Sequence, residues 1–315
     1  MGFDRSDRSG PDGAVISPQP LSARRVTRRP MVSPLRYPGG KGALYARLKW
    51  LIRESGLAGC TYVEPYAGGA GAGLSLLVTG QVDRVVINDL DPAIYAFWRA
   101  LVENPDGLIK RVRKVKLSVR EWKRQRNVYI DCDVDDIESL GFATFYLNRT
   151  NHSGVLNGGP IGGLEQTGRF KIDARFNRPD LEERIRILGL YGNRITVLCE
   201  NGIDVIKRYA RLSKTFVYAD PPYFEKAGSL YMNTFSAQDH VDLSKVLNAM
   251  ARKSWLLTYD DVSQVHDLYK DRRRRSFELN YSAHKVAKAT EIAVLSDRLI
   301  DVGKGWPARW SAHHS

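Results

Sequence analysis

Short apolar runs alternate with helix-like stretches along most of the chain from Pro34 onward. Runs of four to six mostly apolar residues are typical of strands that are buried on both faces of a parallel sheet. The chain has such runs at 60–64, 84–88, 194–199, 215–219 and 254–258, and residues 277–281 and 291–296 predict a closing antiparallel pair. We therefore expect a doubly wound α/β domain whose ligands bind beyond the carboxyl ends of the strands.

This alternation breaks between about residues 104 and 190. Basic helical stretches at 108–116, 119–129 and 137–148 are followed by a glycine-rich segment at 151–163, which indicates an inserted, mainly helical subdomain. The predicted organisation is a flexible basic arm at 1–33, a core at 34–104 and 190–302, an insertion at 105–189 and a polar tail at 303–315.

Composition narrows the class of protein. The chain has 315 residues and a formal net charge of +13, which favours a polyanionic partner without separating DNA from RNA. Its three cysteines, Cys60, Cys132 and Cys199, are too widely spaced for a disulfide framework or a CxxC metal site. No apolar run has the length of a membrane span, and the N-terminus lacks the apolar segment of a signal peptide, so we expect a soluble, cytoplasmic protein.

One strand end carries the most informative chemistry. Asp220-Pro221-Pro222-Tyr223 follows the apolar run 215–219 and combines a carboxylate, main-chain carbonyls without neighbouring N–H groups, and an aromatic ring. Those groups suit a planar amino group, such as the exocyclic NH₂ of a nucleobase. A strand that ends in a proline-rich turn is the simpler alternative.

A second strand end is glycine-rich. Residues 62–73 predict a tight turn between a strand and a helix, and Asp89, at the tip of the next strand, is placed to bind ribose hydroxyls. A purely structural turn or a dinucleotide site fits the same pattern. Asp91 is expected to cap the helix that begins at Pro92. Residues 34–42 resemble a phosphate loop but lack its Gly-x4-Gly-Lys-Ser/Thr spacing, which makes a nucleoside triphosphatase improbable.

Taken together, these segments resemble one family. The motifs at 36–41, 64–69, 88–89, 145–149 and 220–223 occur in the order seen in Dam-like (D12 class) DNA adenine-N6 methyltransferases, which are bacterial or phage-encoded. The resemblance implies a Rossmann-like class I core that uses S-adenosylmethionine and no metal, with a target-recognition insertion. It assigns catalysis to Asp220, Pro221, Pro222 and Tyr223, and cofactor binding to Tyr37, Lys41, Glu64, Tyr66, Gly68, Asp89, Asn201 and Asp220. Asn201 stands where related enzymes often have Asp.

The resemblance also implies how DNA is bound. The target adenine is expected to rotate out of duplex DNA and stack on Tyr223, with Tyr231 and Tyr281 as weaker candidates for the same pocket. DNA contacts fall to Arg36, Arg149, Asn151, His152, Lys171 and Arg175. The run 272–275 is either a phosphate contact or a solvated surface, and His152, His240, His266 and His284 lack metal-site spacing.

Three alternatives stay open at this point: methylation of RNA, methylation of a glutamine amide, and an inactive DNA-binding homologue. The predicted partners are double-stranded DNA and, in a restriction-modification pair, a cognate endonuclease, and the protein is expected to be a monomer.

Overall fold

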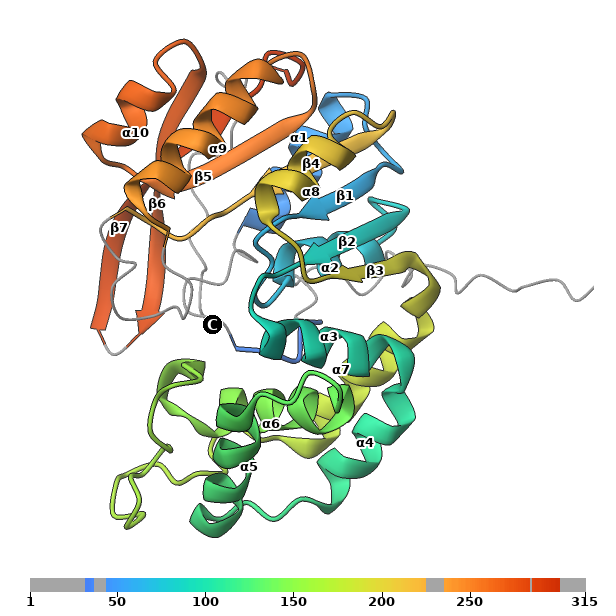
Figure 1. The fold of residues 1–315 in the computed structure, drawn as a ribbon, viewed down its shortest axis with the longest axis vertical. Coiled ribbons are helices and arrows are strands. Elements are labelled where there is room, and N and C mark those ends of the chain that lie inside the picture. The colour runs from blue at the N-terminus through green and yellow to red at the C-terminus, as the bar shows by residue number, and fades with distance from the viewer. Residues whose placement is uncertain (1–31, 37–43, 225–234, 284, 301–315) are drawn as a thin grey trace, which may run out of the picture.

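The computed structural model describes residues 32–36, 44–224, 235–283 and 285–300, with only the backbone described at 279–289. Its described strands form one seven-stranded sheet in the order β3-β2-β1-β4-β5-β7-β6 (Figure 1). The strands are β1 (Thr61–Glu64), β2 (Arg84–Asn88), β3 (Ile195–Leu198), β4 (Thr215–Ala219), β5 (Trp255–Asp260), β6 (Arg273–Ala283) and β7 (Lys285–Leu295). β1 to β5 pair in parallel, while β7 runs antiparallel to β5 and β6. The predicted α/β fold class is confirmed.

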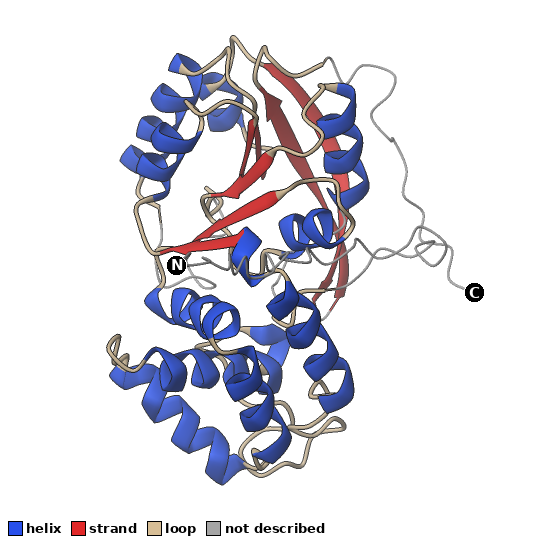
Figure 2. Ribbon diagram, turned by 90° about the vertical axis from the view of Figure 1, so that its right-hand side faces the viewer, coloured by secondary structure: helices blue, strands red, loops and turns tan. Residues whose placement is uncertain are grey.

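Helices cover both faces of this sheet (Figure 2). They are α1 (Tyr45–Glu54), α2 (Gly71–Val78), α3 (Pro92–Glu103), α8 (Gly202–Tyr209), α9 (Ala237–Ala249) and α10 (Ser263–Leu268). Successive strand residues point to opposite faces. Tyr62 accordingly joins the core formed with α1, α2 and α3, while Val63 joins the core formed with α8, α9 and α10.

The helices that interrupt the strand pattern pack below the sheet in Figure 1. They are α4 (Pro105–Lys114), α5 (Val119–Asp131), α6 (Ile137–Thr150) and α7 (Arg178–Leu190), with 3-10 turns η3 (His152–Gly154) and η4 (Gly192–Arg194). α6 runs through the centre of this helical subdomain and is buried from Gly141 to Thr150. Gly141 allows the close approach of α3, because a Cβ there would lie 2.5 Å from the Ala96 carbonyl oxygen.

One apolar core continues from the sheet into the helical subdomain. Phe97 of α3 stacks on Phe145 of α6 with ring centroids 5.8 Å apart, and both belong to the cluster that holds Tyr62 and Val85 of the sheet. The subdomain is therefore rigidly attached. Its predicted limits at 105 and 189 stay a prediction, as do the arm and the tail, which lie almost wholly outside the described residues.

Two local predictions can be compared directly with the structure. Asp91 caps α3, because its Oδ1 accepts a hydrogen bond from the Ala93 N–H at 2.8 Å. The closing antiparallel pair is predicted at 277–281 and 291–296, but its strands, β6 and β7, have 11 residues each. β6 begins four residues earlier than predicted, in the arginine-rich stretch 273–276, and β7 begins six residues earlier at Lys285, because the pairing of the two strands continues where the sequence has no continuous apolar run. In the described part of the chain, no helix has the length and apolar character of a membrane span.

Candidate active site

The carboxyl ends of the parallel strands bring the predicted chemistry together. Glu64 ends β1, Asp89 follows β2, Asp220 follows β4, and Asp260 ends β5. Because β2, β1, β4 and β5 are neighbours and parallel, these side chains lie along one edge of the sheet. The helical subdomain lies on the same side of the molecule, below this edge in Figure 1.

Asp220 is held by a threonine on the adjacent strand. Thr258 Oγ1 donates a hydrogen bond to Asp220 Oδ1 at 2.8 Å, and Tyr218 Oη lies 2.9 Å from Thr258 Oγ1. Thr258 and Tyr218 are 1% and 2% exposed. Asp220 is half-buried, and the hydrogen bond from Thr258 fixes one of its carboxylate oxygens.

The aromatic residues that follow Asp220 are fixed by β5 and β7. Tyr223 donates a hydrogen bond from its hydroxyl to Glu291 Oε1, and Glu291 is 1% exposed. The Phe224 N–H donates to Asp260 Oδ1 at 3.3 Å. Phe224 also stacks on His240 with ring centroids 3.8 Å apart. Burial lowers the pKa of His240, so this imidazole is neutral and packs as an aromatic ring.

The glycine-rich turn after β1 is built around Glu64. Glu64 Oε1 accepts the Gly73 N–H at 2.9 Å, which ties the end of β1 to the first turn of α2. Gly73 is required here, since a Cβ would lie 2.8 Å from the Tyr62 ring. Gly68 and Ala70 have φ of 46° and 45°, the left-handed region. Burial raises the pKa of Glu64 to about 8, so this carboxyl group is mostly protonated at neutral pH.

Asp89 lies beside the glycine turn. Its Oδ2 accepts the Gly68 N–H at 2.8 Å, and its Oδ1 accepts the Asp91 N–H at 3.0 Å. Burial raises the pKa of Asp89 to about 6, and these two N–H groups oppose that shift. Trp98 Nε1 donates to the Gly68 carbonyl at 2.9 Å, so α3 fixes the turn from its other side.

Asn88 joins three strand ends. Its Nδ2 donates to the carbonyls of Pro65 and Glu200 at 2.8 and 2.9 Å, and its Oδ1 accepts the Glu200 N–H at 3.0 Å. The side chain is completely buried. Asn88 therefore sets the spacing of the loops after β1, β2 and β3.

The ring of Tyr66 packs directly against Gly202. A Cβ on Gly202 would lie 2.3 Å from the Tyr66 ring, so only glycine fits at the start of α8. The Tyr66 hydroxyl is buried and has no hydrogen-bond partner among the described residues, and Phe235 packs edge-on against the ring with ring centroids 5.5 Å apart. Asn201 is exposed and caps α8 by accepting the Ile203 N–H at 2.9 Å.

Several predicted residues lie outside the described residues: Tyr37 and Lys41 among the cofactor candidates, and Tyr231 in the base pocket. Only the backbone of Tyr281 is described.

Two predicted DNA contacts occupy buried positions in the helical subdomain. Arg149 is 8% exposed and donates from Nε to the Pro34 carbonyl at 2.6 Å. Burial lowers its pKa to about 9, and the cations of Arg184 and Arg36 add to this effect. Asn151 is completely buried, and its Oδ1 accepts the Trp122 Nε1–H at 2.6 Å. Both side chains support the subdomain, and their contact with DNA stays a prediction.

The other DNA candidates are more accessible. His152, Lys171 and Arg175 are exposed, and Arg36 is half-buried with Nη1 donating to the Asn151 carbonyl at 3.2 Å. His152, Lys171 and Arg175 belong to the segment between α6 and α7, and Arg36 contacts its first residue, Asn151. Their positions suit contact with an extended polyanion, although their role stays a prediction.

The arginine run 272–275 has structural partners. Arg272 pairs with Asp297 at 2.7 Å, Arg273 Nη2 donates to the Ser296 and Leu299 carbonyls at 2.6 Å, and Arg274 donates to the His266 carbonyl. The run lies at the start of β6, level with the amino end of β5, and β7 lies between the two strands. Three of its four arginines are thus used within the fold, at the end of the sheet opposite Asp220.

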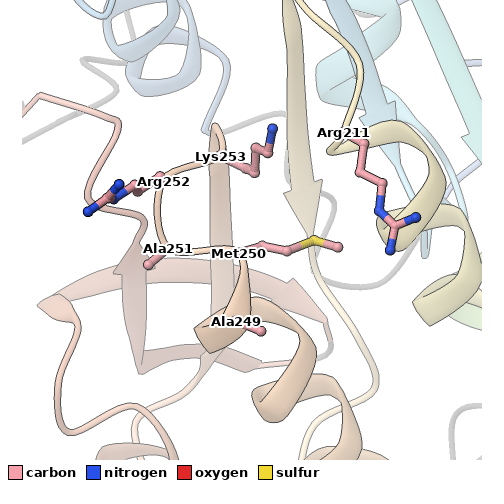
Figure 3. A pocket seen from close by; sticks show the side chains of 6 residues that line it. All are labelled: Arg211, Ala249, Met250, Ala251, Arg252 and Lys253. Carbon is pink, nitrogen blue, oxygen red and sulfur yellow. The ribbon is translucent and has the colours of Figure 1, made fainter.

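A cavity of about 460 Å³ also lies at that opposite end. Figure 3 shows the residues that line it: Arg211, Ala249, Met250, Ala251, Arg252 and Lys253. Arg211 precedes β4 and Lys253 precedes β5, so the cavity is at the amino ends of these strands. It is separate from the predicted chemistry. Among the described residues, no three His, Cys, Asp or Glu side chains gather in a way that could hold a metal ion.

Sequence reasoning missed the residues that support the site. Thr258, Glu291 and Tyr218 were read as strand positions, and Asn88 was noted only within a motif. A polar residue inside a short apolar run was the available signal, because a buried polar group needs a hydrogen-bond partner.

Comparison with known proteins identifies the family. The model of the family described as D12 class N6 adenine-specific DNA methyltransferase matches residues 37–292. The chain is 26% identical over 231 residues to the Type II methyltransferase M.CviBI of Paramecium bursaria Chlorella virus NC1A, covering 70% of this chain and 81% of that protein. It is 24% identical over 284 residues to the retron Ec67 DNA adenine methylase of Escherichia coli, covering 85% and 93%.

A third relative is longer. The modification methylase StsI of Streptococcus sanguinis is 23% identical over 248 residues, which cover 74% of this chain and 35% of that protein. The resemblance predicted from the motifs is confirmed by the family match over most of the chain. The chain belongs to the D12 class N6 adenine-specific DNA methyltransferase family, whose members are transferases.

Proposed function

We propose that this protein transfers the methyl group of S-adenosylmethionine to N6 of an adenine that has rotated out of duplex DNA. The observation that carries the proposal is the position of Asp220 beside Thr258, on the same sheet edge as the glycine turn and Asp89. Family membership supports the reaction, and the arrangement of Asp220, Asp89 and the glycine turn along one edge of the sheet supports its location.

The residues present fit the cofactor. A turn with two left-handed residues brings backbone close to a ligand, and Asp89 offers carboxylate oxygens beside it for ribose hydroxyls. The buried hydroxyl of Tyr66 finds no partner within the described part of the chain and is a donor that a bound polar ligand would satisfy. S-adenosylmethionine, when bound, supplies an electrophilic methyl group on a sulfonium.

The chain's own residues act on the amine. Adenine N6 is a weak nucleophile because its lone pair is delocalised into the ring. If Asp220 accepts one N6 hydrogen and the Pro221 carbonyl accepts the other, the nitrogen is drawn toward tetrahedral geometry and its lone pair becomes available. The positive charge that develops on N6 then lies beside a carboxylate, where it is stabilised. Asp220 need not be a strong base, because the N6 proton can leave after the new N–C bond has formed.

Tyr223 offers a stacking face for the base. Its hydroxyl is tied to Glu291, which restricts rotation of the side chain before the base arrives. Stacking of a base on an aromatic side chain contributes roughly 1–3 kcal/mol. A base inside a duplex cannot present N6 to this edge of the sheet, so the adenine has to leave the stack.

The test uses the purified full chain, duplex DNA that lacks adenine methylation, and deuterium-labelled S-adenosylmethionine. We expect labelled N6-methyladenine in the digested DNA by mass spectrometry, and loss of that product in Asp220→Ala. Asp267→Ala, on the exposed surface of α10, is the matched control and should keep full activity. Label that enters only RNA or protein, or full methylation by Asp220→Ala, would contradict the proposal.

A further inference from the structure

A chain of hydroxyl groups runs behind Asp220. Tyr218 on β4 contacts Thr258 on β5, and Thr258 in turn contacts Asp220. The sheet register explains the contact, because Ala219 pairs with Leu257, and the next residues along these parallel strands are Asp220 and Thr258. Side chains at the same level on neighbouring strands share a face.

The hydrogen atoms in this chain have one consistent direction. The single hydroxyl hydrogen of Thr258 points to the Asp220 carboxylate, so the hydroxyl of Tyr218 donates to Thr258 Oγ1. Burial keeps the pKa of Tyr218 well above its ordinary value, and the negative charge of Asp220 has the same effect. Tyr218 therefore keeps its proton and cannot receive one that passes inward from Asp220.

Both hydroxyl groups are buried at a cost that only hydrogen bonds offset. Tyr218 also stacks on Tyr62 with ring centroids 6.3 Å apart, which fixes its ring. Apolar residues of the same shape would fill these positions without that cost. The arrangement of these two hydroxyl groups, with Tyr218 donating to Thr258 and Thr258 donating to the Asp220 carboxylate, thus points to a task beyond packing.

We propose that Thr258 and Tyr218 are positioning residues that fix the Asp220 carboxylate for methyl transfer and hold it in its ionised form. The inference rests on the proposed function. In this view, Thr258 on β5 and Tyr218 on β4 determine the orientation of the carboxylate. The N6 proton does not leave through these two hydroxyl groups.

The charge environment makes the idea testable by pH. The titratable groups that interact with Asp220 include Glu64 from β1, Tyr218 from β4 and Tyr259 from β5. Two of them are tyrosines whose pKa is raised, and Glu64 is mostly protonated at pH 7, so they add little negative charge there. Loss of a donor to a carboxylate raises the carboxylate pKa. Removal of the Thr258 hydroxyl should therefore shift the acidic limb of the rate profile to higher pH.

The experiment measures single-turnover methyl transfer at saturating cofactor and DNA in Thr258→Val, Thr258→Ser and Tyr218→Phe, with Thr196→Val on the exposed face of β3 as the matched control. We expect Thr258→Val to slow transfer roughly 10- to 100-fold, as small misplacements of reacting groups do. Thr258→Ser should restore most of the rate, and Tyr218→Phe should cost less than Thr258→Val. Cofactor affinity should change less than about threefold, since neither hydroxyl belongs to the proposed cofactor site.

Three results would overturn the inference: an unchanged rate in Thr258→Val, an unshifted pH profile, or a Thr258→Ser variant as slow as Thr258→Val. If Thr258→Val fails to fold, Thr258→Ser and Tyr218→Phe carry the test through the same pH profile. Product analysis of the unmodified protein separates the two proposals. A protein that forms no N6-methyladenine contradicts the proposed function, whereas normal product with an unaffected Thr258→Val contradicts only the positioning role.

Discussion

The carboxyl edge of the sheet and the segment between α6 and α7 differ in how their charged residues are held. At the sheet edge, Asp220, Asp89 and Glu64 are at least half-buried, and each accepts a described hydrogen bond from a specific donor. In the segment 151–175, Lys171 and Arg175 are exposed on a loop.

That loop is held together mainly from within. Gln166 donates from Nε2 to the Ile161 carbonyl at 2.9 Å and accepts the Ile172 N–H at 2.9 Å, while Gly162 and Gly163 have φ of 89° and 75°. The exposed fraction of Phe170 is 56%, and Arg169 lies over its ring at 5.4 Å. Substitutions at the sheet edge should therefore change stability and chemistry together, whereas substitutions of the exposed cations should change only binding to DNA.

The largest expected effect is the pH dependence of stability through Glu64. The pKa of Glu64 is raised from 4.5 to about 8 in the folded state. The favourable contribution of this group to stability is therefore complete below about pH 4.5 and is lost as the pH rises through about 8. The free energy of unfolding should fall by several kcal/mol over that range. Denaturant titrations at a series of pH values should show a much flatter dependence in Glu64→Gln. Glu54→Gln, exposed on α1, should behave like the unmodified protein, and an unchanged slope in Glu64→Gln would refute the assignment.

Next in size is the loss of the Asn88 side chain. Asn88→Ala leaves two carbonyls and one N–H of the strand-end loops without partners, so we expect a loss of about 2–4 kcal/mol in the free energy of unfolding. Urea unfolding measures it. Asn157→Ala, at an exposed position of the loop segment, should change stability by less than about 0.5 kcal/mol. Equal losses of unfolding free energy in Asn88→Ala and Asn157→Ala would contradict the predicted difference between the sheet edge and the loop segment.

The third prediction concerns cofactor affinity and Asp89. If the ionised carboxylate binds ribose hydroxyls, the cofactor should bind about tenfold more weakly at pH 5 than at pH 7. At pH 5 Asp89 is mostly protonated, because its pKa is about 6, and it has to lose this proton before the cofactor can bind. Calorimetric titrations over that range provide the measurement. In Asp89→Asn the affinity should be weaker and nearly independent of pH. A steep pH dependence that survives in Asp89→Asn would assign it to another group.

The smallest effect is expected from the exposed cations. Lys171→Ala and Arg175→Ala should each weaken binding to duplex DNA a few-fold and lower the slope of log affinity against log salt by about 1. Thermal stability should not change. Binding assays at several salt concentrations test this, and an unaltered salt slope in the double variant would remove both residues from the DNA interface.

The sequence predicted the sheet well and the support of the site poorly, for a physical reason. Strands buried on both faces are marked by continuous apolar runs, so β2 and β4 match their predicted ranges. The motif at 220–223 was found because prolines and an acid end such a run. Thr258 and Glu291 bind Asp220 and Tyr223, which are distant from them in sequence. Such a contact leaves no local pattern in the sequence. Arg149 and Asn151 illustrate the reverse problem. Their residue types suit DNA contacts, but both side chains are buried and bind partners inside the protein, the Pro34 carbonyl and Trp122.

One short segment has a practical consequence for protein engineering. Ser33 Oγ donates to the Gly69 carbonyl at 2.6 Å, while Asn148 Nδ2 and Arg184 Nη1 donate to the Arg36 and Ser33 carbonyls at 2.6 and 2.9 Å. Residues 33–36 thus link the glycine turn to α6 and α7 by hydrogen bonds. A chimera that exchanges helical subdomains between relatives has to transplant residues 33–36 together with α6 and α7, or the grafted subdomain will lose its alignment with the carboxyl edge of the sheet.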